Sequence, residues 1–218
     1  MMLRGQTSMN GTNLDSERQA TGVSTARMTE PRSTIDLLRA RTAEHHHALE
    51  SGLDIQNRLS EAATRGPLMA GYHVLHRETA AALRPHLRDM PDLAFSPHIR
   101  ARETPGKTEL PWHEMPPVNP VVPAIGTKAE ALGALYVLEG STLGGRTILR
   151  ALRGRGVSTD GLDFLDPYGK DAGVNWRTFL RVLERETAHS QTTMNECVSG
   201  AITTFALAAT CLRDGRKN

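Results

Sequence analysis

The stretch AEALGALYVLEGSTLGGRTILRAL, residues 129–152, decides the fold. Its apolar residues recur at helical spacing, yet it contains Gly133, Gly140, Gly144 and Gly145. Each glycine inside a helix costs about 1 kcal/mol relative to alanine. A helix that keeps all of them therefore needs something to approach its backbone closely.

Three of these glycines form one bare stripe along the helix. At 100° per residue, Gly140 and Gly144 each lie within about 20° of Gly133. A bare stripe suits either of two partners: a second helix packed tightly against the small residues, or a flat ligand lying against the backbone. The spacing alone does not choose between them.

Length and composition predict one helical domain. A chain of 218 residues is long enough for one sizeable core. The content of 39% hydrophobic and 23% charged residues is that of a globular protein, and the formal charge of +2 argues against a nucleic-acid partner. Because no convincing strand pattern or internal repeat occurs, we predict an all-α fold.

Two segments are predicted to lie outside the helices. Residues 1–32 have too few apolar residues to form a core and are predicted to be a disordered tail, which leaves residues 33–214 as the helical domain. Residues 105–123 hold six of the twelve prolines and are predicted to form a long loop.

The cysteines and the apolar stretches predict a cytoplasmic protein with no membrane span. Cys197 and Cys211 have no paired spacing, which is typical of free thiols in a reducing compartment. The longest apolar stretch, residues 201–212, is too short to cross a bilayer. The N-terminus also lacks the apolar segment of a secretory signal.

Capping pairs and apolar spacing predict where the helices begin. Ser33 with Asp36, and Thr127 with Glu130, have the pattern of residues that cap the start of a helix. A later helix is predicted to begin near Asn175. Apolar residues at helical spacing over 198–212 predict the final helix.

A helix is also predicted between Gly66-Pro67 and Leu87. Gly66-Pro67 is expected to break the chain, since proline suits the first position of a helix. The histidines on the sides of this helix are predicted to be solvated: His73, His76 and His86.

Three consecutive histidines lie on the first predicted helix, whose apolar stripe is centred near Thr42. His45 and His46 each fall about 50° from that centre, whereas His47 points outward. Periodicity therefore excludes His47 from the inner face and leaves His45 and His46 open. A histidine at the edge of the stripe can also be a residue of the core rim that bonds to a backbone carbonyl.

A metal site of the di-iron type has to be considered because the spacing Glu-x-x-His occurs twice. The pairs are Glu44 with His47 and Glu186 with His189. Chance explains both, and Glu44 and His47 face outward, whereas a site inside a bundle needs inward ligands. The motifs of a nucleophilic hydrolase and of a phosphate-binding loop are absent.

One helix with an inward histidine and another with a bare glycine face are what a planar iron porphyrin needs. The segments LRARTAEHHHALE (38–50) and LGALYVLEGSTLGG (132–145) resemble the proximal helix of haem oxygenases and the distal helix of their bacterial branch. The segment DPYGKDAGVNWRTF (166–179) is similar to a region of the haem oxygenases that accompany bacterial phytochromes. The resemblance covers most of residues 34–212. It implies the all-α haem oxygenase-like fold, with haem between the two helices.

On the proximal side, the family pattern Thr-x-x-x-His-x-x-x-Glu falls on Thr42, His46 and Glu50. The resemblance thus implies that His46 is the axial ligand of the haem iron. It also implies that Glu50 orients the imidazole, as carboxylates beside metal-bound histidines commonly do. A solvated glutamate is the alternative reading of Glu50.

On the distal side, Gly140, Gly144 and Gly145 match glycines that let the helix backbone lie against haem and bound O2. Arg39 and Arg177 match regions in which basic side chains hold the haem propionates. The alternative for both arginines is a solvated helix face.

Ser141 stands where many haem oxygenases carry an aspartate that organises water at the distal side. Gly140, Ser141 and Gly144 are therefore the residues expected to act in catalysis, with the proton relay left unassigned. The proline-rich loop of residues 105–123 is a second departure, because relatives usually continue a helix there.

The resemblance implies that haem is both cofactor and substrate. O2 and electrons from a reductase or ferredoxin would open it to biliverdin, ferrous iron and carbon monoxide. A bacteriophytochrome is a candidate partner. Two alternatives stay open: a carrier or sensor that binds haem through His46 without cleaving it, and an inert helical interaction partner with negligible affinity for haem.

Overall fold

The computed structural model describes residues 33–100 and 124–213. The predicted tail of residues 1–32 and the proline-rich loop of residues 105–123 lie outside the described residues. Within them, every regular element is an α-helix or a short 3-10 turn and none is a strand. The all-α fold predicted from the sequence is therefore confirmed. In these same ranges, no helix is both long and apolar enough to cross a membrane.

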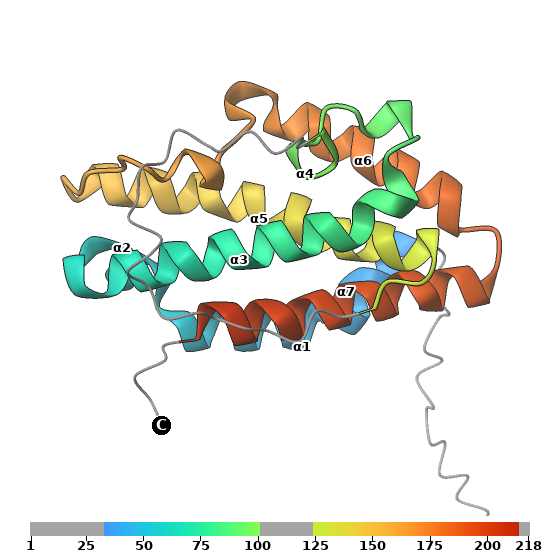
Figure 1. Ribbon diagram of the computed structural model, residues 1–218, viewed down its shortest axis with the longest axis horizontal. Helices are drawn as coiled ribbons and strands as arrows, with labels where there is room; N and C mark the ends of the chain where they lie inside the picture. The colour runs from blue at the N-terminus through green and yellow to red at the C-terminus, as the bar shows by residue number, and fades with distance from the viewer. Residues whose placement is uncertain (1–32, 101–123, 214–218) are drawn as a thin grey trace, which may run out of the picture. The chain divides into compact units, whose positions relative to one another are not determined.

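Seven α-helices and three 3-10 turns make up the described part of the chain (Figure 1). The α-helices are α1 Thr34–Leu53, α2 Ile55–Ser60, α3 Ala62–Leu87, α4 Pro97–Arg100, α5 Lys128–Gly154, α6 Ala172–Thr187 and α7 Gln191–Leu212. The 3-10 turns are η1 Pro91–Leu93, η3 Asp163–Leu165 and η4 Gly169–Asp171.

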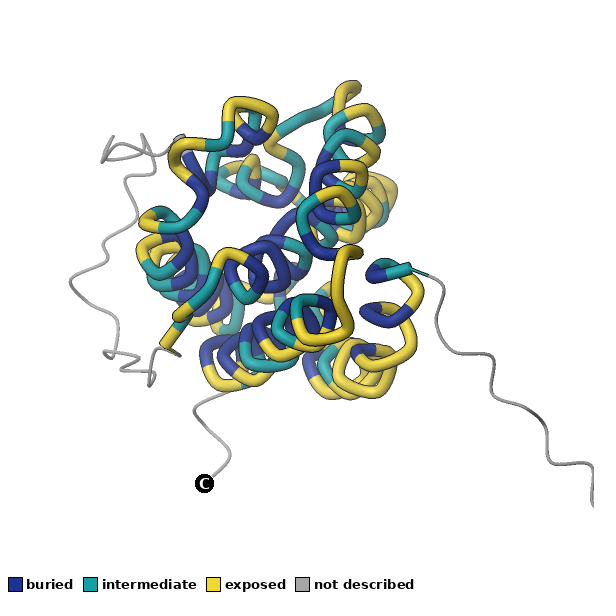
Figure 2. The backbone as a smooth tube through the Cα atoms, turned by 90° about the vertical axis from the view of Figure 1, so that its right-hand side faces the viewer, coloured by how far each residue is buried: buried dark blue, intermediate teal, exposed yellow. Residues whose placement is uncertain are grey.

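The final helix, α7, is the one on which α1, α3 and α5 pack. It lies along α5 and α1 and also contacts α3, which in turn packs against α5 (Figure 1). Among the described helices, α1 and α5 both rest on α7 while making little direct contact with each other. The buried stretches of the helices face inward (Figure 2). Fully buried members of this core include Leu38, Leu68, Leu132, Leu135 and Phe179.

The helix starts follow the capping signals in the sequence. The Ser33 hydroxyl accepts a hydrogen bond from the Asp36 amide at 3.1 Å and begins α1. Thr127 and Glu130 form a complete capping box at the start of α5, because each side chain accepts from the backbone amide of the other residue. Both predicted starts are confirmed.

The predicted break at Gly66-Pro67 is wrong, because α3 begins at Ala62 and runs through Pro67. Proline normally crowds the Cβ and amide of the residue before it. Gly66 has no Cβ, so the helix can pass through this pair. A Cβ built at Gly66 would meet nothing within 4 Å, so packing is not what requires a glycine there.

The histidines of α3 differ from the solvated side chains predicted. His73 is exposed, but His76 is partly buried and its ring centroid lies 5.0 Å from that of His98 on α4. The Nε2 atom of His86 lies 2.9 Å from the carbonyl oxygen of Ile125. The prediction is therefore wrong for His76 and His86, because segments distant in the sequence pack over them.

Candidate functional site

His46 is an exposed imidazole held by two neighbours. It lies on α1, where its Nδ1 atom is 3.3 Å from Oε2 of Glu50, one helical turn further on. Its ring meets that of Phe205 on α7 edge to face, with centroids 5.9 Å apart. With Nδ1 directed at a carboxylate, Nε2 is the nitrogen left for a ligand.

The neighbouring histidines lack this arrangement. His45 stacks on Phe205 with ring centroids 6.4 Å apart, and His47 is exposed. Among the described residues, neither has an ion pair with a carboxylate. The contact with Glu50 distinguishes His46 from His45, but all three histidines are exposed, so the prediction that one of them lies on the inner face of the helix is wrong.

The glycines of α5 serve two different purposes. A Cβ at Gly133 would overlap the backbone carbonyl of Cys197 on α7, and a Cβ at Gly145 would overlap the carbonyl of Leu165. These two glycines are explained by close packing within the protein. The predicted contact of Gly145 with haem is therefore not needed to account for it.

Gly140 and Gly144 form the open part of the stripe. A Cβ at Gly140 would lie 3.7 Å from the ring of Trp176, an ordinary contact, and a Cβ at Gly144 would meet nothing within 4 Å. Neither glycine is required by packing against the described residues. The sequence left two explanations of the glycine stripe, a closely packed helix and a flat ligand. A packed helix accounts for Gly133, whereas the described residues leave room for a ligand beside Gly140 and Gly144.

The packed and open glycines predict opposite effects of alanine on folding. Gly133→Ala is expected to lower the free energy of unfolding by about 1–3 kcal/mol or more, since its Cβ must displace the backbone of α7. Gly144→Ala is the matched control on the same helix and should raise that free energy by up to about 1 kcal/mol. Urea denaturation of both variants measures the difference. Equal effects would contradict the division of the stripe.

Ser141 follows the first open glycine. It is exposed, and its hydroxyl donates to the carbonyl oxygen of Leu138 at 2.7 Å. The serine proton is thus engaged with its own helix, while the oxygen can still accept a hydrogen bond.

An aromatic pair joins α5 to α6 beside the open glycine Gly140. Tyr136 lies on α5 one turn before Gly140, and its ring centroid is 5.5 Å from that of Trp176 on α6. Burial raises the pKa of Tyr136, and the positive charge of Arg39 opposes that shift. Arg39 belongs to α1. Arg39 also lies 4.0 Å from Asp36, and both side chains are exposed.

Arg177 lines a groove of about 450 Å³ along α6. Val174, Thr178, Leu180 and Arg181 line the same groove, so two guanidinium groups one helical turn apart share it. The sequence interpretation singled out Arg177 and missed Arg181. The spacing of four residues between two arginines was the signal that could have identified the pair.

A buried carboxylate beside the glycine face was also missed. Glu139 is 1% exposed and accepts hydrogen bonds from the hydroxyls of Ser96, at 2.6 Å, and Tyr168, at 2.8 and 2.9 Å. These bonds join α5 to the segments before α4 and α6. A lone glutamate inside an otherwise apolar helical run was the available signal, because charged side chains are rarely buried without partners.

Burial raises the pKa of Glu139, while its hydrogen bonds from Ser96 and Tyr168 oppose the shift. A raised pKa means that folding favours the protonated form, so this contribution to stability is present below pH 4.5 and is lost as pH rises through the folded-state pKa. The unfolding free energy of wild type should thus fall with pH relative to Glu139→Gln. Urea denaturation between about pH 4 and pH 8 tests this. A constant difference across that range would contradict the raised pKa.

The residue types that commonly bind metal ions are histidine, cysteine, aspartate and glutamate. Among the described residues, no group of three or more His, Cys, Asp or Glu side chains is placed to hold a metal ion. Cys197 and Cys211 are free and buried. Burial raises the pKa of Cys197 to about 12 and that of Cys211 to about 11, so neither presents a thiolate at neutral pH.

A comparison with known proteins points in the same direction as the resemblance. The chain is 38% identical over 98 residues to a heme oxygenase of Xanthomonas campestris pv. campestris (strain 8004). The similarity supports a relationship to heme oxygenases. It covers 44% of this chain and 58% of the relative, so the chain spans little more than half of that protein. No protein-family model and no solved structure matches the chain.

Proposed function

We propose that the protein is a haem oxygenase that binds haem between α1 and α5. The observation that carries this proposal is the His46 imidazole, whose Nδ1 atom faces Glu50 and whose Nε2 atom is left for a metal. Metal-bound histidines commonly direct their second nitrogen at a carboxylate in this way, which fixes the tautomer and strengthens the ligand. The 38% identity to a heme oxygenase supports the same assignment.

The glycines of α5 suit the opposite face of a flat ligand. Gly140 and Gly144 have no side chain to cover the helix backbone. A larger side chain at Gly144 would occupy the space beside the helix, which is free of described atoms. Haem could therefore approach the helix closely at these two residues. Trp176 lies beside Gly140 and would border the ring.

The arginines suit the two propionates of haem. Arg177 and Arg181 share one groove, and guanidinium groups bind carboxylates with paired hydrogen bonds. Arg39 is a third cation near the space between α1 and α5, and it would compensate a further negative charge. Three arginines on two helices thus would fix the orientation of an anionic, planar substrate.

Bound haem would supply the site that activates O2, and the haem ring itself would be the substrate. The protein would hold the iron through His46, exclude bulky groups at Gly140 and Gly144, and direct water at the open face through the oxygen of Ser141. Glu139 would act on this face indirectly, by fixing the α5 turn that carries Gly140 and Ser141.

The expected products are biliverdin, ferrous iron and carbon monoxide, with electrons from a reductase or ferredoxin. A bacteriophytochrome that takes up the biliverdin fits the similarity of residues 166–179 to its associated oxygenases. Cytoplasmic location is part of the same proposal, because both partners act there.

A haem carrier or sensor is the second candidate, and Ser141 favours it. Its hydroxyl proton is directed at Leu138 and the position lacks a carboxylic acid, so proton delivery to the distal side has no evident donor among the described residues. Such a protein would use the same histidine and the same glycines without opening the ring.

The deciding experiment adds one equivalent of haemin to the purified chain and then an electron donor in air, with catalase present. Loss of the Soret band together with the rise of a biliverdin band is expected of the oxygenase. A Soret band that shifts on reduction and then persists would identify the carrier or sensor. Absence of haem binding would overturn both.

A further inference from the structure

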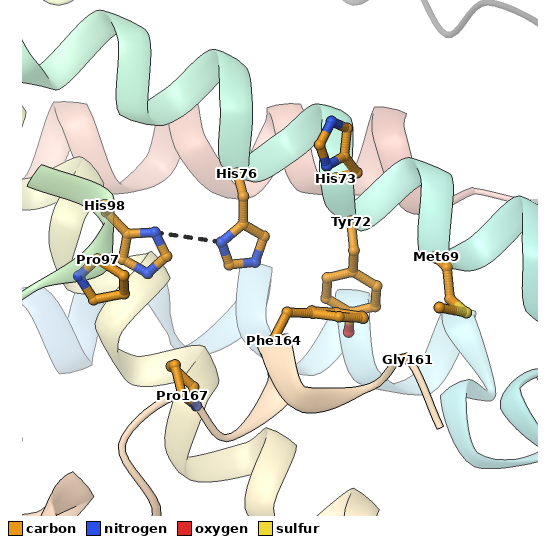
Figure 3. A pocket seen from close by; sticks show the side chains of 9 residues that line it. All are labelled: Met69, Tyr72, His73, His76, Pro97, His98, Gly161, Phe164 and Pro167. Carbon is orange, nitrogen blue, oxygen red and sulfur yellow. Dashed lines mark hydrogen bonds between the residues drawn. The ribbon is translucent and has the colours of Figure 1, made fainter. Parts of the chain in front are cut away.

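A cavity of about 220 Å³ lies between α3, α4 and the segment around η3 (Figure 3). None of its lining residues is among those assigned to haem. Cavities of about 150 Å³ in proteins bind benzene, so this one has room for one or two fused rings.

The walls of the cavity are apolar and aromatic. Tyr72 and Phe164 face each other with ring centroids 5.4 Å apart, and Met69 and Pro97 complete the walls (Figure 3). Flat rings pack favourably against such surfaces. Among the described residues, the lining includes no arginine or lysine.

The polar part of the cavity is a pair of histidines. The Nδ1 atoms of His76 and His98 lie 3.5 Å apart, and His98 is 8% exposed. Its Nε2 atom is buried and has no hydrogen-bond partner among the described residues. In Figure 3 the second ring nitrogens of both histidines point toward the side where Pro167 lies.

Both histidines are neutral at physiological pH. Burial lowers the pKa of His76 to about 4, and the nearby His73 adds to this shift. Burial also holds the pKa of His98 well below its usual value, with a further contribution from His76. Each ring therefore carries one proton, and a hydrogen bond between the two Nδ1 atoms uses the proton of one ring only.

One shared proton gives the two Nε2 atoms opposite chemistry. The ring that donates from Nδ1 keeps a bare Nε2 atom, which accepts a hydrogen bond. The ring that accepts at Nδ1 carries its own proton on Nε2, which donates. When the two Nδ1 atoms share a proton in this way, the pair has one Nε2 donor and one Nε2 acceptor, whichever ring donates.

We propose that this cavity is a binding site for a small, neutral, flat lactam, whose N–H and C=O groups pair with Nε2 of His76 and His98. The aromatic walls hold the rings, and the ligand supplies the partner that Nε2 of His98 lacks among the described residues. This site is independent of the proposed haem chemistry.

The test is a titration of the full chain, without haem, with 2-quinolone, a neutral two-ring lactam. Binding is followed by ligand fluorescence and by calorimetry, and it should saturate below about 1 mM. The matched ligand is 1-methyl-2-quinolone, which has the same rings but no N–H donor. It should bind at least about tenfold more weakly, because a polar group of the site is then left unpaired.

Two variants locate the binding. His98→Phe keeps a flat ring but removes the unpartnered nitrogen, and it should weaken 2-quinolone at least about tenfold. His47→Phe is the control, because His47 is exposed on α1 and is not among the residues that line the cavity, so the affinity of this variant should stay within about twofold of wild type. Circular dichroism melting verifies that each variant is folded.

Equal affinity for the two quinolones would overturn the lactam assignment and leave an apolar cavity. Saturable binding that His98→Phe leaves unchanged would place the ligand elsewhere, and absence of saturable binding would overturn the site. If His98→Phe does not fold, the pair of ligands on the wild-type chain still decides the proposal. Haem turnover is not part of any of these measurements, so failure here leaves the oxygenase proposal intact.

Discussion

His46→Ala is expected to abolish the absorption spectrum of histidine-ligated haem, because it removes the imidazole whose Nε2 atom is left open by the contact between Nδ1 and Glu50. Haem affinity should fall by at least about tenfold, because mutating a residue that only orients a metal ligand already costs about 10- to 100-fold. The measurement is a haemin titration followed by absorption and electron paramagnetic resonance. Added imidazole should restore much of the spectrum, since the cavity left by the side chain can accept a free ligand.

The neighbouring histidines provide matched controls. His45→Ala and His47→Ala should retain the wild-type spectrum, because neither side chain has the carboxylate contact that orients His46. Glu50→Gln should keep the ligand but weaken haem binding by about 10- to 100-fold. An unchanged spectrum in His46→Ala, or its loss in His45→Ala, would transfer the ligand assignment to another residue.

Local signals in the sequence predicted the helical framework well. The caps at Ser33 and Thr127 depend on residues three positions away, so they can be read from a few letters of sequence. The all-α fold follows from helical spacing over long segments. The predicted break at Pro67 failed because a single neighbour, Gly66, relieves the steric conflict on which the rule depends.

The histidine cavity and Glu139 could not be predicted because they depend on residues far apart in the chain. His76 meets His98 across 22 positions, and Glu139 meets Ser96 across 43. Helical periodicity describes only how a side chain is directed on its own helix. Helical periodicity does not say which distant segment of the chain packs against that side of the helix.

The glycine stripe was predicted in part from local sequence and depends in part on contacts between distant residues. The sequence predicted a close approach along the stripe but left a helix and a flat ligand as alternatives. In the structure α7 packs against Gly133, whereas no described atom lies within 4 Å of a Cβ placed at Gly144. Which glycines are covered depends on how far the contact between α7 and α5 extends. A local sequence pattern does not contain that information.

Gly144→Leu is expected to separate folding from haem binding. Leucine is a better helix former than glycine and would meet no described atom near its Cβ, so the free energy of unfolding should stay equal or rise by up to about 1 kcal/mol. The same side chain would fill the space that haem needs against α5. Haem affinity should therefore fall by at least about 100-fold, equivalent to about 2.7 kcal/mol.

Gly154→Leu is the matched control, because it lies at the end of the same helix and a Cβ there also meets nothing within 4 Å. It adds the same side chain outside the proposed site and should leave the haemin titration unchanged. Stability is measured by urea denaturation and affinity by the Soret band on the same preparations. If Gly144→Leu folds and still binds and turns over haem normally, haem does not lie against the open glycines, and the space beside α5 must serve another ligand.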